Sequence, residues 1–196
     1  MKKDFLVIVR GGGDLATGCI HRLWSAGFKV LVLECAAPAA IRRQVSVCEA
    51  VYEGSNVFEG MTAVLINNVQ EADSVWQAGN VPVLVDEDGA CIKELKPDVV
   101  VDAIIAKKNL GTKIDMAPLT IALGPGFEAG VDVDAVVETK RGHNLGRVFW
   151  EGTAAPNTGI PGVIGGFGKE RVIHCPAKGI LRNVKKITDA VRKGDV

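Results

Sequence analysis

This 196-residue chain lacks an excess of charge of either sign, and it also lacks any long apolar run. Its 23 basic and 23 acidic residues cancel, which argues against a sequence-wide electrostatic footprint for DNA, RNA or an anionic membrane. The apolar run at residues 5–9 is too short for a transmembrane helix, and no small-residue cleavage site follows it. We therefore expect a cytoplasmic protein with no nucleic-acid or membrane partner, in which any anion site is local.

Cysteine pairs and several catalytic motifs are also missing. The five cysteines form no C-x-x-C pair, which argues against a disulfide framework and against a metal site. There is no G-x-S-x-G elbow, no H-E-x-x-H, no Walker lysine and no evident carboxylate pair. Cys175 follows His174, but adjacency in the sequence does not place a thiol against an imidazole. No catalytic residue is assigned, and whether the chain is an enzyme stays open.

The chain does contain 47% apolar residues and 23 glycines, a composition that suits strands joined by tight turns. Strand-like runs alternate with helix-like stretches, as in βαβ units. A helix is expected after the first glycines, stopping near Gly27, and strands are expected at residues 5–9, 29–33, 62–66, 81–85, 99–105, 136–137 and 148–150. Because the first five runs are almost continuously apolar, we predict parallel strands covered on both faces. The predicted fold class is α/β, a Rossmann-like parallel sheet with a β-rich C-terminal extension.

The first glycines form a G-x-G-x-x-A motif between the first strand and the first helix. The motif residues are Gly11, Gly12, Gly13, Asp14, Leu15 and Ala16. Gly11 would make the turn, Gly13 would let the backbone approach a phosphate, and Ala16 would allow close packing of helix on strand. Glu34 ends the next strand, where an acidic residue usually accepts from ribose hydroxyls. The motif therefore predicts a nucleotide phosphate on the helix N-terminus.

Residues near this turn leave other interpretations open. Asp14 could simply cap the helix, with the glycines permitting a sharp turn and no ligand at all. Glu34 favours an unphosphorylated ribose, but Arg42 and Arg43 could reverse that preference in favour of a 2′-phosphate. Arg10 stands where an apolar residue is usual, and it could pair with a phosphate or with Asp14.

A second glycine-rich region lies at residues 122–168. Its loop places Arg141, His143, Asn144 and Arg147 close enough together in sequence to form a compact anion or ligand patch. A glycine hairpin with solvated arginines is an equally good interpretation. The run at residues 107–109 follows the 99–105 strand and could reach a ligand at the carboxyl edge of the sheet, or could be a solvated loop.

The chain is expected to have two parts, a Rossmann-like domain with its glycine-rich β extension at residues 1–168 and a shorter segment at 169–196. The second part resembles the opening half of a biotinyl/lipoyl-type barrel-sandwich, in which a G-x-L/V strand and a turn lead to V-x-K-G-D-x-L. The chain stops at Gly194-Asp195-Val196, where that motif would enter its next strand, so we expect a partial module or a truncated chain. The alternative is a short β-hairpin with a lysine-rich, solvated face.

Several long segments together resemble one protein family. They are VRGGGDLATG at 9–18, AIRR at 40–43, EAVYEG at 49–54, VDA at 101–103, AKKN at 106–109, LGPGF at 123–127, AGVD at 129–132 and RGHNLGRV at 141–148. On these segments nearly the whole chain resembles the YqeB family, accessory proteins of selenium-dependent molybdenum hydroxylases, distantly similar to the XdhC maturation factors of xanthine dehydrogenase.

This resemblance implies a role in maturing a molybdenum hydroxylase, either by holding its molybdenum cofactor or by delivering sulfur or selenium to it. It transfers no catalytic residue. The implied partners are the hydroxylase and other cofactor-maturation proteins, and a homo-oligomer is a further expectation. A pterin dinucleotide cofactor could place one anionic end on the turn at 11–16 and another part on the loop at 141–147.

Two alternatives stay open beside that role. One is an NAD-dependent oxidoreductase that binds NAD(P), with Glu34 on the ribose and His143 or Lys107 handling a proton. The other is a noncatalytic adaptor, whose Rossmann fold docks on the hydroxylase and binds no small molecule.

Overall fold

The computed structural model describes residues 5–160, 162–180 and 182–195. Its contacts divide the chain into two compact units, Met1–Pro156 and Asn157–Val196. This division falls before residue 168, where the sequence places the boundary. All the strands belong to the first unit.

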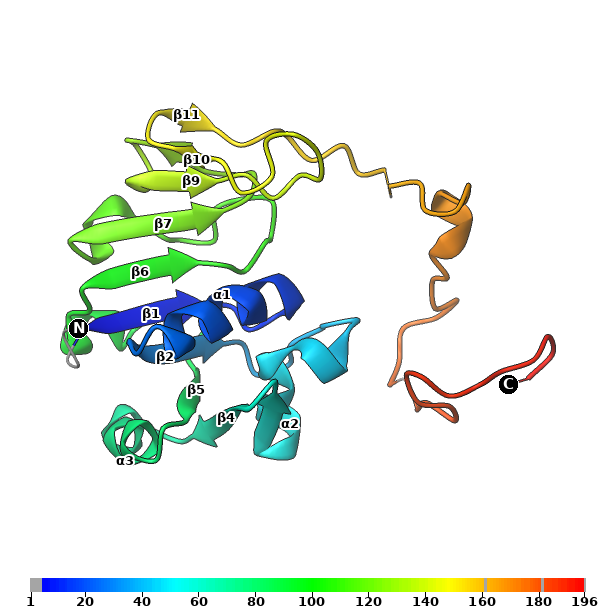
Figure 1. The fold of residues 1–196 in the computed structure, drawn as a ribbon, viewed down its shortest axis with the longest axis horizontal. Helices are drawn as coiled ribbons and strands as arrows, with labels where there is room; N and C mark the ends of the chain where they lie inside the picture. The colour runs from blue at the N-terminus through cyan, green and yellow to red at the C-terminus, as the bar shows by residue number, and fades with distance from the viewer. Residues whose placement is uncertain (1–4, 161, 181, 196) are drawn as a thin grey trace. The chain divides into compact units, whose positions relative to one another are not determined.

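The first unit is built on a nine-stranded sheet in the order β10-β9-β7-β6-β1-β2-β5-β4-β3 (Figure 1). The seven inner strands run parallel, whereas the edge strands β3 and β10 pair antiparallel with β4 and β9. A separate antiparallel pair joins β8 to β11. The strands are β1 Leu6–Arg10, β2 Lys29–Glu34, β3 Ser55–Phe58, β4 Met61–Ile66, β5 Val81–Val85, β6 Val99–Asp102, β7 Leu119–Leu123, β8 Glu128–Ala129, β9 Ala135–Val137, β10 Val148–Phe149 and β11 Gly152–Thr153.

The predicted fold class is confirmed. The elements that follow β7 in the described part of the chain are four strands and a 3-10 helix, so the extension is rich in β-structure. Most of the expected strands agree with the observed ones to within one residue at each end. Strands β3, β7, β8 and β11 are additions that the sequence patterns did not identify.

Each central strand contributes to two cores, because successive side chains of a strand point to opposite faces of the sheet. In β1, Val7 and Val9 belong to one core and Ile8 belongs to the other. The side chains of β2 alternate in the same way. Burial on both faces explains why these strands are almost continuously apolar in the sequence.

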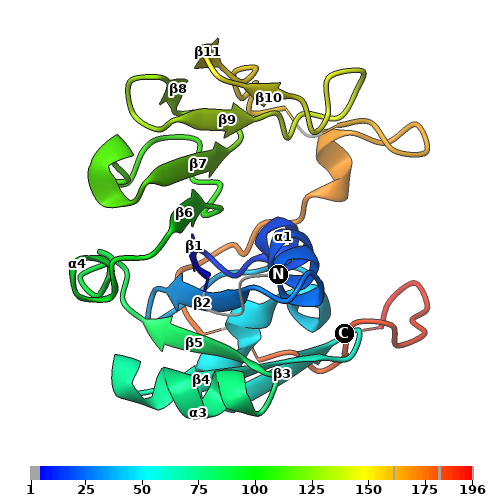
Figure 2. The ribbon, with the colours of Figure 1, turned by 60° about the vertical axis from the view of Figure 1, so that its left-hand side comes forward.

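The helices cover the two faces of the sheet (Figure 2). Helix α1, Asp14–Ser25, follows the glycine turn as predicted and packs Ala16 and Ile20 into the first core. Gly27 lies just beyond it with φ of +82°, the left-handed conformation that commonly ends a helix. Helices α3, Ala72–Gln77, and α4, Ile92–Leu95, pack on the second core.

The other helical segments are short. They are α2 Ala50–Glu53 and the 3-10 turns η1 Arg43–Val45, η2 Val47–Glu49, η3 Val69–Glu71, η4 Ile114–Met116 and η5 Lys169–Arg171. In the described part of the chain, no helix is long and apolar enough to cross a membrane.

The order of the strands creates a switch point beside β1. Strand β1 lies between β2 and β6, so the chain builds one half of the sheet on the β2 side and the other half on the β6 side. The turns that leave β1 and β6 therefore diverge at the carboxyl edge of the sheet. In open parallel sheets, ligands bind in the crevice at this kind of position.

Strand β6 is shorter than the sequence indicates. The apolar run predicts a strand to residue 105, but β6 ends at Asp102. The Asp102 side chain accepts a hydrogen bond from the Ile104 N–H at 3.2 Å, which is a local turn that competes with the strand ladder. Ile105 then takes a left-handed φ of +57°. The apolar residues after Asp102 thus form a loop at the switch point.

The second unit contains little regular structure. Its described residues hold an isolated bridge between Ile164 and Phe167 and the turn η5, with no strand among them. Ile180 and Val184, in the segment predicted as half of a barrel-sandwich, are 93% and 77% exposed. A strand pair needs a packed face to be stable, and these side chains have none. The barrel-sandwich stays a prediction.

Candidate functional site

The first two glycines of the turn are required by packing within the chain itself. Gly11 has φ of +94°, and a Cβ there would lie 2.8 Å from the Ile104 Cα. A Cβ on Gly12 would lie 3.0 Å from the Cys48 backbone nitrogen, whose N–H donates to the Gly12 carbonyl. The close approach that these glycines permit joins the β1 turn to the β6 loop and to η2.

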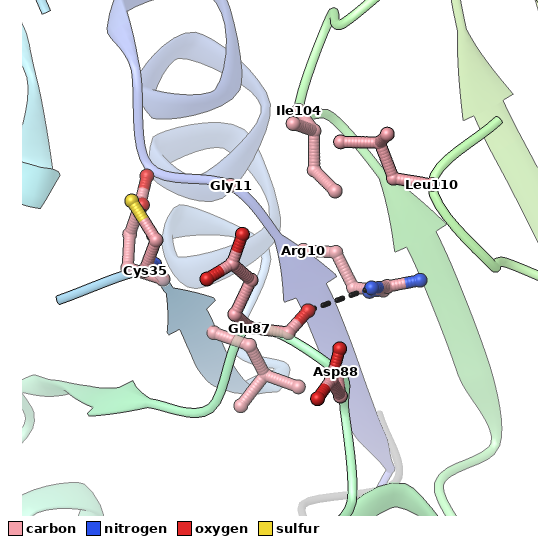
Figure 3. A pocket seen from close by; sticks show the side chains of 9 residues that line it. Arg10, Gly11, Cys35, Glu87, Asp88, Ile104 and Leu110 are labelled. Atoms are coloured by element: carbon pink, nitrogen blue, oxygen red, sulfur yellow. Dashed lines mark hydrogen bonds between the residues drawn. The ribbon is translucent and has the colours of Figure 1, made fainter. Parts of the chain in front are cut away.

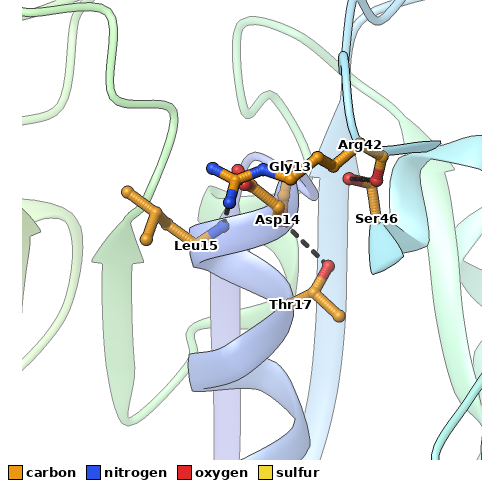
Figure 4. Close-up of polar contacts among 6 residues, drawn as sticks. All are labelled: Gly13, Asp14, Leu15, Thr17, Arg42 and Ser46. Carbon is orange, nitrogen blue, oxygen red and sulfur yellow. Dashed lines mark hydrogen bonds and ion pairs between the residues drawn. The ribbon is translucent and has the colours of Figure 1, made fainter. Parts of the chain in front are cut away.

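Gly13 is different, because no atom of the described residues, apart from Gly13 and its two chain neighbours, lies within 4 Å of the place where its Cβ would be. Its φ is −64°, which any L-residue can adopt. Gly13 precedes α1, and its carbonyl accepts a hydrogen bond from the Thr17 hydroxyl at 2.8 Å (Figure 4). The backbone at the start of α1 therefore faces open space, and a ligand can approach it closely.

The charged groups at the start of α1 are Asp14 and Arg42. Asp14 accepts a hydrogen bond from the Leu15 N–H and forms an ion pair with Arg42 (Figure 4). The sequence offered Arg10 as a partner of Asp14, but the structure gives that role to Arg42. The Arg42 guanidinium adds positive charge at the N-terminus of α1, where the helix dipole is also positive. The Asp14 carboxylate adds negative charge at the same place.

Glu34 is held against the turn by the backbone. One carboxylate oxygen accepts from the Gly12 N–H at 2.7 Å, and the other accepts from the Cys35 N–H at 2.9 Å. The structure thus brings the acidic residue at the end of β2 to the glycine turn, as the motif requires. Each carboxylate oxygen keeps a second lone pair that can accept from a hydroxyl or an N–H group.

Arg10, at the end of β1, is buried at 2% exposure. Its guanidinium donates to the Thr112 hydroxyl at 2.6 Å and to the Glu87 carbonyl at 2.8 Å, and its Nε has no hydrogen-bond partner among the described residues. The Thr112 hydroxyl in turn donates to the Asp102 carboxylate at 2.6 Å. Arg10 and Asp102 are therefore linked through one hydroxyl at the ends of two adjacent strands.

Burial raises the pKa of Asp102, and the hydrogen bonds from Thr112 and Ile104 and the charge of Arg10 offset this only in part. The loop that carries Thr112 is held by Asn109, whose side chain accepts from the Thr112 N–H and donates to the Thr112 carbonyl. Asn109, which the sequence offered as a ligand-contacting residue, thus anchors the loop at the switch point.

A pocket of about 450 Å³ lies at this switch point (Figure 3). It opens at the carboxyl ends of β1, β2, β5 and β6. Its lining residues are Arg10, Gly11, Leu33, Glu34, Cys35, Glu87, Asp88, Ile104 and Leu110. Sequence reasoning identified Arg10, Gly11 and Glu34, and missed Glu87 and Asp88. Those two acidic residues directly follow an expected parallel strand, which is the signal that could have found them.

Two thiols lie around Glu34. Cys35 lines the pocket, and burial raises its pKa, as does the Glu34 carboxylate to a smaller extent. Burial, with added repulsion from Glu34 and Glu49, raises the pKa of Cys48 to about 12. Both groups are therefore thiols rather than thiolates near neutral pH. Cys175, the residue with an adjacent histidine, lies in the second unit and is exposed.

The loop with Arg141, His143, Asn144 and Arg147 connects β9 to β10 and is exposed. Since β9 runs parallel to β1 through β7 and β6, the loop lies at the same edge of the sheet as the glycine turn. Three strand spacings separate β9 from β1, which corresponds to about 14 Å. None of these four residues lines the pocket. The structure places the two glycine-rich loops at one edge without joining them.

Glu138 anchors this loop to the extension. Its carboxylate accepts from the Lys140 N–H at 2.7 Å and from the Ala155 N–H at 2.8 Å. Burial raises the pKa of Glu138, but the backbone N–H donors outweigh that effect and the net shift is downward. The conformation of the loop therefore depends on an ionised carboxylate.

The comparisons with known proteins identify a relative. The chain is 52% identical over 191 residues to the protein named "Uncharacterized protein YqeB" of Escherichia coli (strain K12). The match covers 97% of the chain and 35% of the relative, so the chain spans about a third of the length of that protein. No family model matches the chain, and no solved structure does.

Proposed function

We propose, from the homology of this chain to YqeB over nearly its whole length, that it binds a nucleotide-bearing cofactor and serves as an accessory protein in the maturation of a molybdenum hydroxylase. The observation that carries the binding proposal is the pocket at the switch point, where the glycine turn, Glu34 and Arg10 meet. Crevices of this kind hold nucleotide ligands in parallel α/β sheets.

In this proposal the phosphate lies at the start of α1. The first N–H groups of a helix have no backbone acceptor within the helix, and the helix dipole favours an anion there. In α1 the Leu15 N–H donates to the Asp14 carboxylate, so a phosphate that uses this N–H would replace that contact. Gly13 leaves room for the phosphate, and Arg42 supplies positive charge beside it. Glu34 would accept from the ribose hydroxyls through its remaining lone pairs, and a ring system of the ligand would enter the pocket.

The second loop extends the proposal to a longer ligand. Arg141 and Arg147 belong to the loop that follows β9, at the same edge of the sheet as the turn, and β9 itself lies about 14 Å from β1. A pterin dinucleotide carries its diphosphate between two ring systems, so the diphosphate would bind the turn while another part of the molecule reaches toward this loop. The unpartnered Nε of buried Arg10 and the open backbone at Gly13 both support a ligand at this edge.

The accessory role rests on the sequence segments that resemble the selenium-dependent hydroxylase system. In that role the chain would hold the molybdenum cofactor and pass it to the hydroxylase.

Calorimetric titration of the chain with the pterin dinucleotide cofactor, NAD, NADP and AMP tests the binding proposal. We expect the pterin dinucleotide to bind most tightly, and Gly13→Val to abolish that binding without unfolding the chain. Gly18→Ala is the matched control, since Gly18 is also free of close neighbours but lies inside α1. Preference for NAD would favour the oxidoreductase, and binding of none of these would favour the adaptor.

The accessory role is tested by reconstitution. The chain loaded with the cofactor is mixed with a cofactor-free molybdenum hydroxylase, and hydroxylase activity is followed over time. We expect faster recovery of activity with the chain than with free cofactor at the same concentration, and no acceleration with Gly13→Val. Equal recovery with and without the chain would contradict the role.

A further inference from the structure

Arg10 has more hydrogen-bond donors than the chain satisfies. A guanidinium carries five N–H groups, and the described contacts use two of them, to Thr112 and to the Glu87 carbonyl. Nε has no acceptor although it is buried. The Asp102 carboxylate reaches this guanidinium through the Thr112 hydroxyl. A buried cationic donor without an acceptor is costly, so a ligand that supplies a neutral or anionic oxygen is the natural complement.

The other charged residues of the pocket are acidic, opposite in charge to Arg10. The carboxylates of Glu34, Glu87 and Asp88 belong to the lining, and ionised carboxylates act as acceptors alone. Leu110 and Ile104 form an apolar wall across from Arg10 and Asp88 (Figure 3). Three negative charges against one positive charge disfavour a phosphate inside the pocket. They favour a neutral, flat group that has several N–H donors and one acceptor.

We infer that this pocket binds the ring of the ligand by a 2-amino-4-oxopyrimidine edge, the edge shared by guanine and pterins, and prefers it to adenine. This inference rests on the proposed function, because it names which end of the nucleotide-bearing ligand enters the pocket. The edge presents one carbonyl oxygen beside three N–H groups, and the amino group of guanine is a donor that adenine lacks at this position. The carbonyl suits Arg10, and the adjacent N–H groups suit one carboxylate.

Titration with four nucleosides tests the edge directly. Guanosine has the carbonyl and the amino group, inosine lacks the amino group, 2-aminopurine riboside lacks the carbonyl, and adenosine has neither in these positions. We expect guanosine to bind best, and each single loss to weaken binding by about tenfold, since hydrogen bonds to charged groups are the stronger ones. Free pterin, tested beside guanosine, shows whether the ring or the nucleoside is preferred.

Asp88→Asn tests the same contact from the side of the protein. It replaces a carboxylate, which only accepts hydrogen bonds, with an amide, which both donates and accepts, and the residue is exposed. We expect guanosine affinity to fall about tenfold and inosine affinity, which depends on the ring N–H alone, to fall by a smaller factor. Asp73→Asn, on the exposed side of α3, is the control and should change neither.

Equal binding of guanosine and inosine, or tighter binding of adenosine, would overturn the inference. If the nucleosides fail in this way while a dinucleotide still binds and Gly13→Val still abolishes that binding, the proposed function stands and this inference falls. If no ligand binds at all, both fall.

Discussion

The carboxylate of Glu34 accepts a hydrogen bond from the Gly12 N–H at 2.7 Å, and this contact joins the end of β2 to the glycine turn after β1. The residues are 22 positions apart in the chain, but β1, which leads into the turn, pairs with β2, which ends at Glu34. The contact fixes the carboxylate where a ribose would lie. It also uses one backbone donor of the turn, so a phosphate must bind at Gly13 and the first turn of α1.

Glu34→Gln tests whether this carboxylate contacts the ligand. The amide keeps one acceptor for the Gly12 N–H but loses the negative charge and one acceptor position. We expect the affinity for a nucleotide-bearing ligand to fall about tenfold, as for other charge-assisted hydrogen bonds. Calorimetry measures the change, with Glu151→Gln as a control on an exposed residue. Unchanged affinity in Glu34→Gln would remove Glu34 from the site.

Gly11 and Gly13 should respond differently to alanine in the absence of ligand. Gly11→Ala places a Cβ 2.8 Å from the Ile104 backbone at φ of +94°, and we expect a loss of about 2 kcal/mol or more in the free energy of unfolding. Gly13→Ala has open space and a permitted φ, so we expect a loss below about 1 kcal/mol. Urea unfolding separates the two, and similar losses would contradict this account of the turn.

Thr112 should be sensitive to the loss of its hydroxyl. Thr112→Val removes the hydroxyl that accepts from the Arg10 guanidinium and donates to the Asp102 carboxylate, and we expect the free energy of unfolding to fall by about 2–4 kcal/mol. Thr112→Ser keeps the hydroxyl and removes one methyl group, which costs about 1 kcal/mol. Chemical denaturation of the two variants makes the comparison. An equal loss in both variants would show that packing, and not the two hydrogen bonds of the Thr112 hydroxyl, stabilises this loop.

Glu138 should contribute to stability in a pH-dependent way. Its pKa in the folded chain is below the ordinary value of 4.5, so its stabilising effect is present above that value and is lost as pH falls through the folded pKa. We expect Glu138→Gln to be less stable than the unchanged chain at pH 7, with the difference narrowing below pH 4.5. Urea unfolding across this range measures it. A difference that does not vary with pH would show that the charge of Glu138 is unimportant.

The local parts of the fold could be predicted from the sequence. Continuous apolar runs identified five of the seven parallel strands, β1, β2, β4, β5 and β6, because both faces of the sheet are covered there. The glycine motif identified the turn and α1 because glycine adopts the positive φ that a sharp turn from a strand into a helix requires. Glu34 was identified by its position at the end of the next strand.

The long-range parts could not be predicted in this way. The Arg10–Thr112 contact joins residues 102 positions apart, and no local pattern specifies it. Strand β5 lies between β2 and β4, an order that depends on how all the strands pack. The burial of Arg10 and its hydrogen bond to the Glu87 carbonyl are properties of the folded chain alone. The sequence could not show them, so it offered Arg10 as a partner for a phosphate.

The most direct test of the nucleotide site is an NMR titration of the ¹⁵N-labelled chain with the pterin dinucleotide cofactor. A 20.7 kDa chain is within reach of amide-resolved spectra. The account predicts that the largest shifts fall on the amides of Gly13, Asp14 and Leu15, with further shifts at Cys35 and Asp88, and that Gly13→Val removes them. Saturable shifts confined to residues away from the carboxyl edge of the sheet, or no shifts at saturating cofactor, would contradict it.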